Sequence, residues 1–339
     1  MGALSDYLGF GGISRLQLIA VAMSVAVIGT QGLIYFNIIQ KEHLPYINEH
    51  IPVISHLIGG ILFGIGMMLA SGCPTQQCVN LGKGNLKSLL AIPIIAITAQ
   101  ITLSGSLSSI RLYIDDLLKI SHVNLYEKLP YLGILIGLIL LILCVIWLGR
   151  SLLKNNIKKS KFIEILFYGS LVGFIVIAMW YICGHLAFIA EDELTLEHAY
   201  IGNSSKTIQS LSMILPTTYL LDWLMYSSDS MRFLNANTML IFGLIIGSVL
   251  ICLFNIVNNM IKYKNNLSDS LNDFELQFFK TPQDFLQYFL GSILMGIGGV
   301  LAIGCSVGQG LSAFSTLSIG SVISIIGMFI GAKIVYKFS

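Results

Sequence analysis

Long runs of apolar residues alternate with short polar segments along almost the whole chain. Eight of these runs reach about 17 residues, the length that an α-helix needs to cross the roughly 30 Å hydrocarbon core of a membrane. The predicted spans are 16–39, 56–72, 86–108, 131–149, 162–189, 236–261, 284–304 and 317–337. The runs are continuous and lack the alternating ten-residue pattern of a membrane β-barrel. The sequence therefore predicts an all-α integral membrane protein with about eight or nine membrane-spanning helices.

Two further segments have a mixed pattern. Residues 207–226 are apolar but contain Pro216, Asp222 and several hydroxyl residues, which predicts a re-entrant or broken segment. Residues 109–122 have the amphipathic period of a helix that lies in the membrane interface.

The composition agrees with a membrane protein and excludes several other classes. Of the 339 residues, 55% are apolar and only 11% are charged, whereas soluble proteins carry about 25% charged residues. So few charges cannot cover a soluble protein of this length, and the net charge of +2 provides no basic surface for nucleic acid. We therefore expect neither a soluble enzyme nor a nucleic-acid partner.

The distribution of basic residues predicts the orientation, because cytoplasmic loops of membrane proteins are enriched in Lys and Arg. The linker 150–161 is basic and is assigned to the cytoplasm, whereas the acidic segment 191–193 falls outside. Following the eight spans from this linker places both termini in the cytoplasm, together with most of the 19 Lys and Arg residues.

An internal repeat is the strongest signal in the sequence. Residues 60–73 match residues 292–305 at a constant offset of 232 positions. The paired residues include Gly64 with Gly296, Gly66 with Gly298, Ala70 with Ala302, Gly72 with Gly304, Cys73 with Cys305 and, beyond the cysteines, Gln77 with Gln309. The Gly-x-Gly positions suit close helix packing, but packing does not explain a Gly-Cys pair that ends a hydrophobic helix within the membrane.

The number of crossings between the two copies predicts their relative direction. Five crossings separate the start of span 56–72 from the start of span 284–304, so the copies run in opposite directions, as in transporters built from inverted repeats. We expect a first repeat over 1–149 with a re-entrant loop near 72–82, and a second over 207–339 with a loop near 304–314. Between them, 150–206 would form a basic cytoplasmic linker, a connecting helix and an acidic outer loop. The two loops would meet near the membrane centre.

The loop residues favour contact with a small, soft anion. Backbone N–H groups at helix ends attract anions, Gly72 and Gly304 allow close approach, and the thiols of Cys73 and Cys305 are weak, polarizable donors. We expect these four residues to bind substrate. Three further candidates are Gln77, Gln309 and Cys78. Because neutral donors bind an anion weakly at several sites, the pattern favours passage over retention.

Other reactive residues carry no comparable signal. Cys183 and His185 lie near each other in sequence, but two residues are too few for a metal or proton site, so we interpret them as packing residues. The sequence contains no P-loop or C-x-x-C motif, and we expect neither a metal nor a cofactor.

At the Gly-Cys blocks the sequence resembles the YeeE/YedE family of sulfur transporters. The resemblance covers nearly the whole chain and is carried by residues 60–73, 81–88 and 295–312, with weaker matches at 13–17, Trp180, Tyr181 and Pro216. It implies an hourglass-shaped helical protein in the bacterial inner membrane that takes up thiosulfate, with loop thiols passing the ion along by S–H···S hydrogen bonds. A small soluble sulfur carrier of the TusA type is the partner that it implies. One departure is that no cysteine precedes Cys73, whereas some members have a third functional cysteine in the first inward loop.

Two alternatives stay open at the level of sequence. The substrate could instead be sulfide, polysulfide, sulfite or a selenium compound. The chain could also be a membrane sulfurtransferase that forms a persulfide on Cys73 or Cys78, although no general base lies near either loop in sequence.

Overall fold

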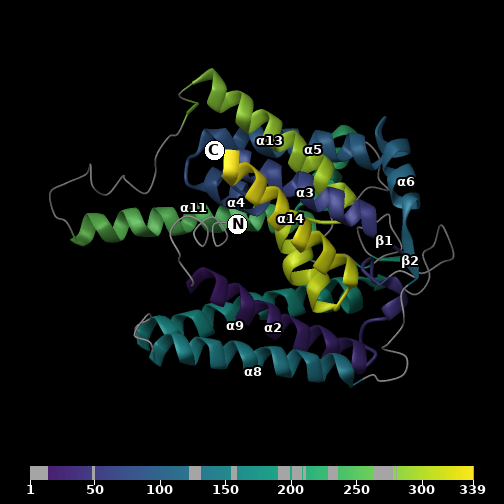
Figure 1. Cartoon of the computed structure of the whole chain (residues 1–339). Helices are drawn as coiled ribbons and strands as arrows, with labels where there is room; N and C mark the ends of the chain where they lie inside the picture. Colours follow the sequence, from purple (N-terminus) through teal and green to yellow (C-terminus); the bar gives the residue numbers. More distant parts are fainter. Residues whose placement is uncertain are drawn as a thin grey trace. The chain divides into compact units, whose positions relative to one another are not determined.

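A computed structural model of the chain describes ten segments, and the account below is confined to them. They are residues 14–47, 50–121, 131–153, 159–189, 199–200, 208, 211–227, 236–262, 278–279 and 281–338. These segments are almost entirely helical (Figure 1).

The longer helices follow the apolar runs of the sequence. They are α2 (Ser14–Tyr35), α3 (Val53–Leu69), α5 (Leu86–Leu103), α8 (Leu132–Leu153), α9 (Lys159–Tyr181), α11 (Ala236–Lys262), α13 (Pro282–Leu301) and α14 (Ile319–Phe338). Shorter helices are α4 (Pro74–Gly82), α6 (Ser108–Leu117), α10 (Ile214–Met225), the 3₁₀ turn η1 (Lys41–His43) and the π-helical turns η2 (Ile182–Leu186) and η4 (Gly308–Ala313).

Two short antiparallel strand pairs lie among the connectors. β1 (His50–Pro52) pairs with β2 (Lys119–Ser121), with Ile51 opposite Ile120. β3 (Phe188–Ile189) pairs with β4 (Ala199–Tyr200).

The prediction of eight membrane spans is confirmed within the described segments. The helical stretches long and apolar enough to cross a membrane are Ser14–Tyr35, Val53–Gly82, Leu86–Leu103, Leu132–Ser151, Ser160–Leu186, Asn237–Val257, Pro282–Leu301 and Ile319–Lys337. The chain is thus a multi-pass membrane protein. The second stretch contains the break between α3 and α4.

The two mixed segments also form helices. The amphipathic segment 109–122 forms a helix only as far as Leu117, the end of α6, because residues 119–121 pair with β1 as strand β2. Most of 207–226 forms the 12-residue helix α10. At 1.5 Å per residue, α10 is about 18 Å long, too short to cross the hydrocarbon core by itself. Whether α10 enters the membrane and returns stays a prediction.

Contacts divide the chain into two compact units. The first comprises residues Met1–His56, Asp115–Ser212 and Ser306–Ile325. Its centre is α2, which packs against both α8 and α9 around Val21, Leu148 and Ile165 (Figure 1). Polar groups also join these helices, since the Gln17 side chain donates to Ser151 Oγ at 2.9 Å.

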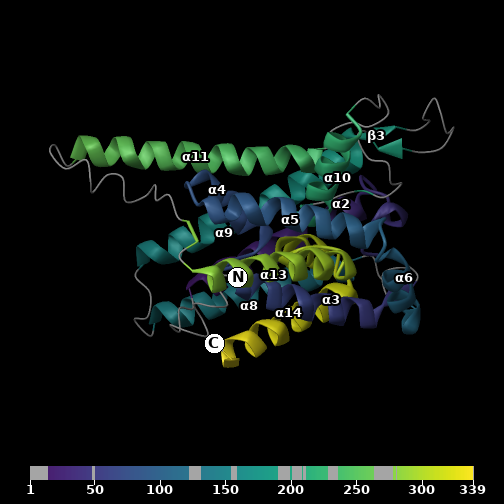
Figure 2. The ribbon, with the colours of Figure 1, turned by 90° about the horizontal axis from the view of Figure 1, so that it is seen from above.

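The second unit comprises residues Leu57–Ile114, Met213–Cys305 and Ile326–Ser339. Within it α5 packs against α13, α4 and α10, and the long helix α11 packs against α4 and α10 (Figure 2). These units are defined by contacts, whereas the predicted repeats at 1–149 and 207–339 are defined by sequence symmetry. The division into repeats therefore stays a prediction.

Glycines bring α3 and α13 of the second unit unusually close together. A Cβ atom built on Gly66 would lie 2.5 Å from Gly291 O, and one built on Gly298 would lie 2.4 Å from Phe63 N. No side chain fits at these crossings because the neighbouring atoms belong to backbone. The glycines thus set the distance between the two helices that end in Gly-Cys.

Candidate functional site

The first Gly-Cys segment is a sharp backbone break at the end of α3. Ala70 N donates to Gly66 O, and Gly72 N reaches back to Met67 O at 2.9 Å, which closes the last turn. Ser71 and Gly72 have φ angles of +55° and +151°. Cys73 then occupies the N-cap of α4, followed by Pro74 in the first helical turn. Since proline has no N–H and its φ suits this position, it starts α4 at the expected place.

The second Gly-Cys segment has the same backbone. Ala302 N donates to Gly298 O, and Gly304 N donates to Gly299 O at 2.8 Å. Ile303 and Gly304 have φ angles of +56° and +155°, close to those of the first copy. The sequence repeat is therefore also a repeat of local structure. Glycine is needed at both sites because L-residues with a side chain rarely adopt such a large positive φ.

Three of the predicted cysteines come together in the second unit. Cys73, Cys78 and Cys305 are 7%, 1% and 0% exposed, and Cys78 lies near enough to both others to feel a charge on either thiol. Cys78 lies on α4, one turn after the first break. Cys78 of the first segment and Cys305 of the second, 227 positions apart in sequence, thus belong to one unit, and their contact with a substrate stays a prediction.

The predicted glutamines have different surroundings. Gln77 is fully buried on α4, and four hydrogen bonds of its amide are described below. Gln309 is also fully buried, in η4 of the first unit. The neighbouring Gln76, by contrast, is exposed and donates to Asn80 Oδ1 on the same helix at 3.0 Å.

Sequence reasoning missed two residues beside the first break, Ser88 and Tyr288. Ser88 Oγ donates to Gln77 Oε1 at 2.8 Å, and Tyr288 Oη donates to the same oxygen at 2.6 Å. Both side chains are almost fully buried. The available signal was weak: each is a polar residue within a predicted span or at its end, where an unsatisfied hydroxyl would be costly.

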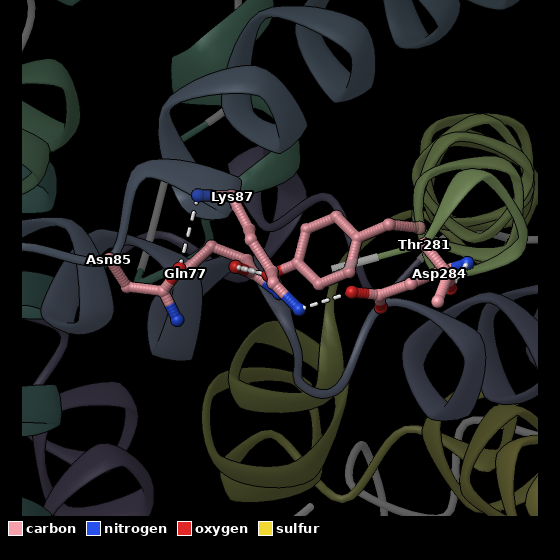
Figure 3. Close-up of polar contacts among 6 residues, drawn as sticks. Gln77, Asn85, Lys87, Thr281 and Asp284 are labelled. Carbon is pink, nitrogen blue, oxygen red and sulfur yellow. Dashed lines mark hydrogen bonds and ion pairs between the residues drawn. The ribbon is translucent and has the colours of Figure 1, made fainter. Parts of the chain in front are cut away.

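An ion pair lies next to this hydrogen-bonded group. Lys87 Nζ is 2.6 Å from Asp284 Oδ2, and it lies 5.5 Å from the centre of the Phe279 ring. Figure 3 shows Lys87 and Asp284 directed toward each other, beside Gln77. Asn85 caps α5 by accepting from Lys87 N, and Thr281 caps α13 by accepting from Asp284 N. The cation at the edge of the first loop is therefore paired with a carboxylate.

Two other cysteines, Cys144 and Cys183, lie in the first unit. Cys144 Sγ accepts from Ser24 Oγ at 3.5 Å within the first unit. Cys183 is buried in η2, while His185 is exposed and packs its ring against Tyr181. Within the described segments, no group of three or more His, Cys, Asp or Glu residues is placed to hold a metal ion.

Comparison with known proteins identifies the family of the chain. The family model described as "Sulphur transport" matches residues 1–265 and 267–334. The thiosulfate transporter TsuA of Escherichia coli strain K12 is 23% identical over 327 residues, covering 93% of this chain and 83% of TsuA. TsuA of Spirochaeta thermophila is also 23% identical, over 318 residues that cover 88% of this chain and 82% of the relative. The chain, a multi-pass membrane protein with two matching Gly-Cys breaks, thus belongs to the sulphur transport family.

Proposed function

We propose that this protein is an inner-membrane permease that takes up thiosulfate by passing it along the thiols of Cys73, Cys78 and Cys305. The observation that carries the proposal is the clustering of these thiols at two breaks with the same backbone. Membership of the sulphur transport family supports a sulfur compound as substrate. The two TsuA relatives support thiosulfate among such compounds.

The chemistry of the breaks suits a soft divalent anion. A thiol is a weak and polarizable donor, and the backbone N–H groups at the start of α4 add positive partial charge. Gly72 and Gly304 allow an ion to approach the backbone, and Gln309 is a further contact in the proposal. Because each donor is neutral, the ion is held weakly at each position and can move on.

We propose further that the two halves of the transporter are inverted repeats whose Gly-Cys loops are re-entrant. Contacts between α3 and α13 support this relation, because they occur in exchanged pairs. Gly59 meets Ala302, while their sequence equivalents Gly291 and Ala70 meet each other. Gly66 likewise meets Met295, and the equivalent pair is Gly298 with Phe63. Such an exchange is the signature of a two-fold axis between the copies.

Uptake of radiolabelled thiosulfate into bacteria lacking other uptake routes tests the proposal. Expression of the protein should produce saturable uptake. Cys73→Ala and Cys305→Ala should each lower the initial rate at least about tenfold, since hydrogen bonds to a charged group contribute about 1.5–3 kcal/mol. Cys144→Ala is the matched control, because its thiol bonds to Ser24 in the first unit. Unchanged uptake in both loop variants would refute the thiol pathway.

Competition in the same assay separates thiosulfate from the alternative substrates. Unlabelled thiosulfate should suppress uptake at lower concentration than sulfite, sulfide, polysulfide or selenium anions. A covalent persulfide on Cys73 or Cys78 after exposure to thiosulfate, detected by mass spectrometry, would instead indicate a sulfurtransferase. Binding of a TusA-type carrier stays a prediction from the family resemblance.

A further inference from the structure

The side-chain amide of Gln77 uses its whole hydrogen-bonding capacity within the protein. An amide has two N–H donors and two acceptor positions on its oxygen. The nitrogen of Gln77 donates to Ala70 O at 2.6 Å and to Gly72 O at 3.4 Å. The oxygen accepts from Ser88 Oγ and from Tyr288 Oη. All four positions of the Gln77 amide are therefore occupied within the protein, which leaves the amide no hydrogen-bonding capacity for a transported ion.

The two bonds from the nitrogen stabilise the first break itself. Carbonyl groups at and just beyond a helix end have no partner within that helix, and Ala70 and Gly72 directly follow the end of α3 at Leu69. Between these two residues, Ser71 has a positive φ that is unusual for a residue with a side chain. Gln77 thus holds both sides of the strained residue, directly before Cys73.

The two bonds to the oxygen connect the break to two other helices. Ser88 lies in the first turn of α5, and Tyr288 lies on α13, the helix that ends at Cys305. The Lys87–Asp284 ion pair joins the same two helices beside this point (Figure 3). Lys87 precedes Ser88, and Asp284 lies one turn before Tyr288. Movement of α4 would therefore break bonds to α5 and α13 together.

We infer that Gln77, Ser88 and Tyr288 form a clamp that fixes the positions of the Cys73 and Cys78 thiols. In this role Gln77 is a positioning residue, and it does not touch the ion. Gln77 directly precedes Cys78, and the two carbonyl groups that it holds lie just before Cys73. One hydrogen-bonded side chain thus controls both thiols of the first loop. Only the uptake part of the test below rests on the proposed function.

The two hydroxyl groups of the clamp have no counterpart at the equivalent positions of the repeat. At the offset of 232 positions, Ser88 and Tyr288 correspond to Gly320 and His56. There the imidazole fills the space that glycine leaves, since a Cβ on Gly320 would lie 2.7 Å from His56 Nε2. His56 Nδ1 pairs with Ser324 Oγ at 2.8 Å. The two Gly-Cys breaks therefore share a backbone but differ in the side chains that support them.

Alkylation of the thiols in purified, detergent-solubilised protein tests the clamp. Each cysteine is followed by peptide-resolved mass spectrometry during reaction with N-ethylmaleimide, a reaction that requires local opening at buried sites. Tyr288→Phe keeps the ring and removes one hydrogen bond, and Ser88→Ala removes the other. We expect each to raise the alkylation rates of Cys73 and Cys78 about fivefold, the change in open population that follows the loss of one hydrogen bond. Tyr131→Phe, which removes an exposed phenol bonded to Tyr35, is the matched control.

Comparison with the other cysteines separates a local clamp from general destabilisation. In Tyr288→Phe and Ser88→Ala the increase at Cys73 and Cys78 should exceed any increase at Cys144 and Cys183, which lie in the first unit. Equal increases at all cysteines, or no increase at Cys73 and Cys78 in either variant, would overturn the inference. In the uptake assay, a raised KM of Tyr288→Phe or Ser88→Ala without changed alkylation rates would also overturn the inference. That result would make Gln77 part of a substrate-binding surface. Failure of wild-type protein to carry thiosulfate would refute the proposed function alone, since alkylation still decides the clamp.

Discussion

At the scale of single residues, Gly72 and Gly304 carry the two breaks. Each has a φ angle above +150°, and each is followed directly by a candidate thiol. Sequence analysis predicted that these glycines and cysteines form the two loops, because the internal repeat aligns them at a constant offset. It could not predict that Gln77 is saturated by protein partners, since Tyr288 lies 211 positions further along the chain. Such a bond depends on helix packing, which leaves no periodic trace in the sequence.

Replacing Gly72 by alanine should destabilise the protein. The alanine would have to adopt a backbone conformation that only glycine populates readily, at a cost of about 1–3 kcal/mol in folding free energy. Its Cβ atom would also lie 3.0 Å from Gln76 Cγ. We expect the melting temperature in detergent to fall by several degrees and thiosulfate uptake to fall with it. Gly32→Ala is the control with the opposite sign. A Cβ there meets nothing within 4 Å, and alanine in a helix gains about 0.5–1 kcal/mol over glycine. Equal melting temperatures for the two variants would contradict this account.

The hydroxyl of Ser212 provides a second test at this scale. Ser212 is 4% exposed, and its Oγ has no hydrogen-bond partner among the described residues. Burying an unpaired hydroxyl is unfavourable, so Ser212→Ala should leave the melting temperature unchanged or raise it. Ser88→Ala is the matched comparison, because it removes a bonded hydroxyl of equal size and leaves a lone pair of Gln77 unpaired. It should lower stability by about 1–3 kcal/mol. A larger loss in Ser212→Ala than in Ser88→Ala would contradict the prediction.

At the scale of helices, the apolar pattern was sufficient for the membrane spans but not for the short elements. Each predicted span coincides with a candidate membrane helix, because burial in lipid requires a continuous apolar run. The break after α3 was also foreseen from the Gly72-Cys73 pair. The length of α10 was not, because Pro216 lies in its first turn, where proline fits, rather than interrupting it.

The crossing of α3 and α13 yields a prediction about both helices. Gly298→Ala places a Cβ 2.4 Å from Phe63 N, and Gly66→Ala places one 2.5 Å from Gly291 O. Neither clash can be relieved by a side-chain rotation, because backbone atoms are on the other side. We expect the free energy of unfolding of each variant to fall by about 3 kcal/mol. A variant that is destabilised further should fail to give monodisperse protein in size-exclusion chromatography. Gly243→Ala on α11, where a Cβ meets nothing within 4 Å, should keep or slightly raise the stability. Normal yield and stability of Gly298→Ala would refute the close crossing.

At the scale of the whole molecule, the transport direction depends on orientation, which rests on the distribution of cations. Most of the 19 Lys and Arg residues fall on the side assigned to the cytoplasm, and the eight candidate spans of the described segments would return the chain to that side. An even number of crossings places both termini together, and the basic linker 150–161 decides on which face. Uptake then requires the Gly-Cys loops to receive the ion from the opposite face.

Fusion of reporters to the C-terminus tests this orientation in bacteria. Green fluorescent protein should fluoresce there because it folds in the cytoplasm, whereas alkaline phosphatase should be inactive because it needs the periplasm to form its disulfides. Both reporters placed between residues 190 and 206, in the acidic connector, should give the opposite result. Replacing the five cations of 150–161 by glutamine should weaken the asymmetry and give a mixed population, since charges near the span ends set the topology. An active phosphatase at the C-terminus would reverse the assignment and, with it, the direction in which the loops receive the ion.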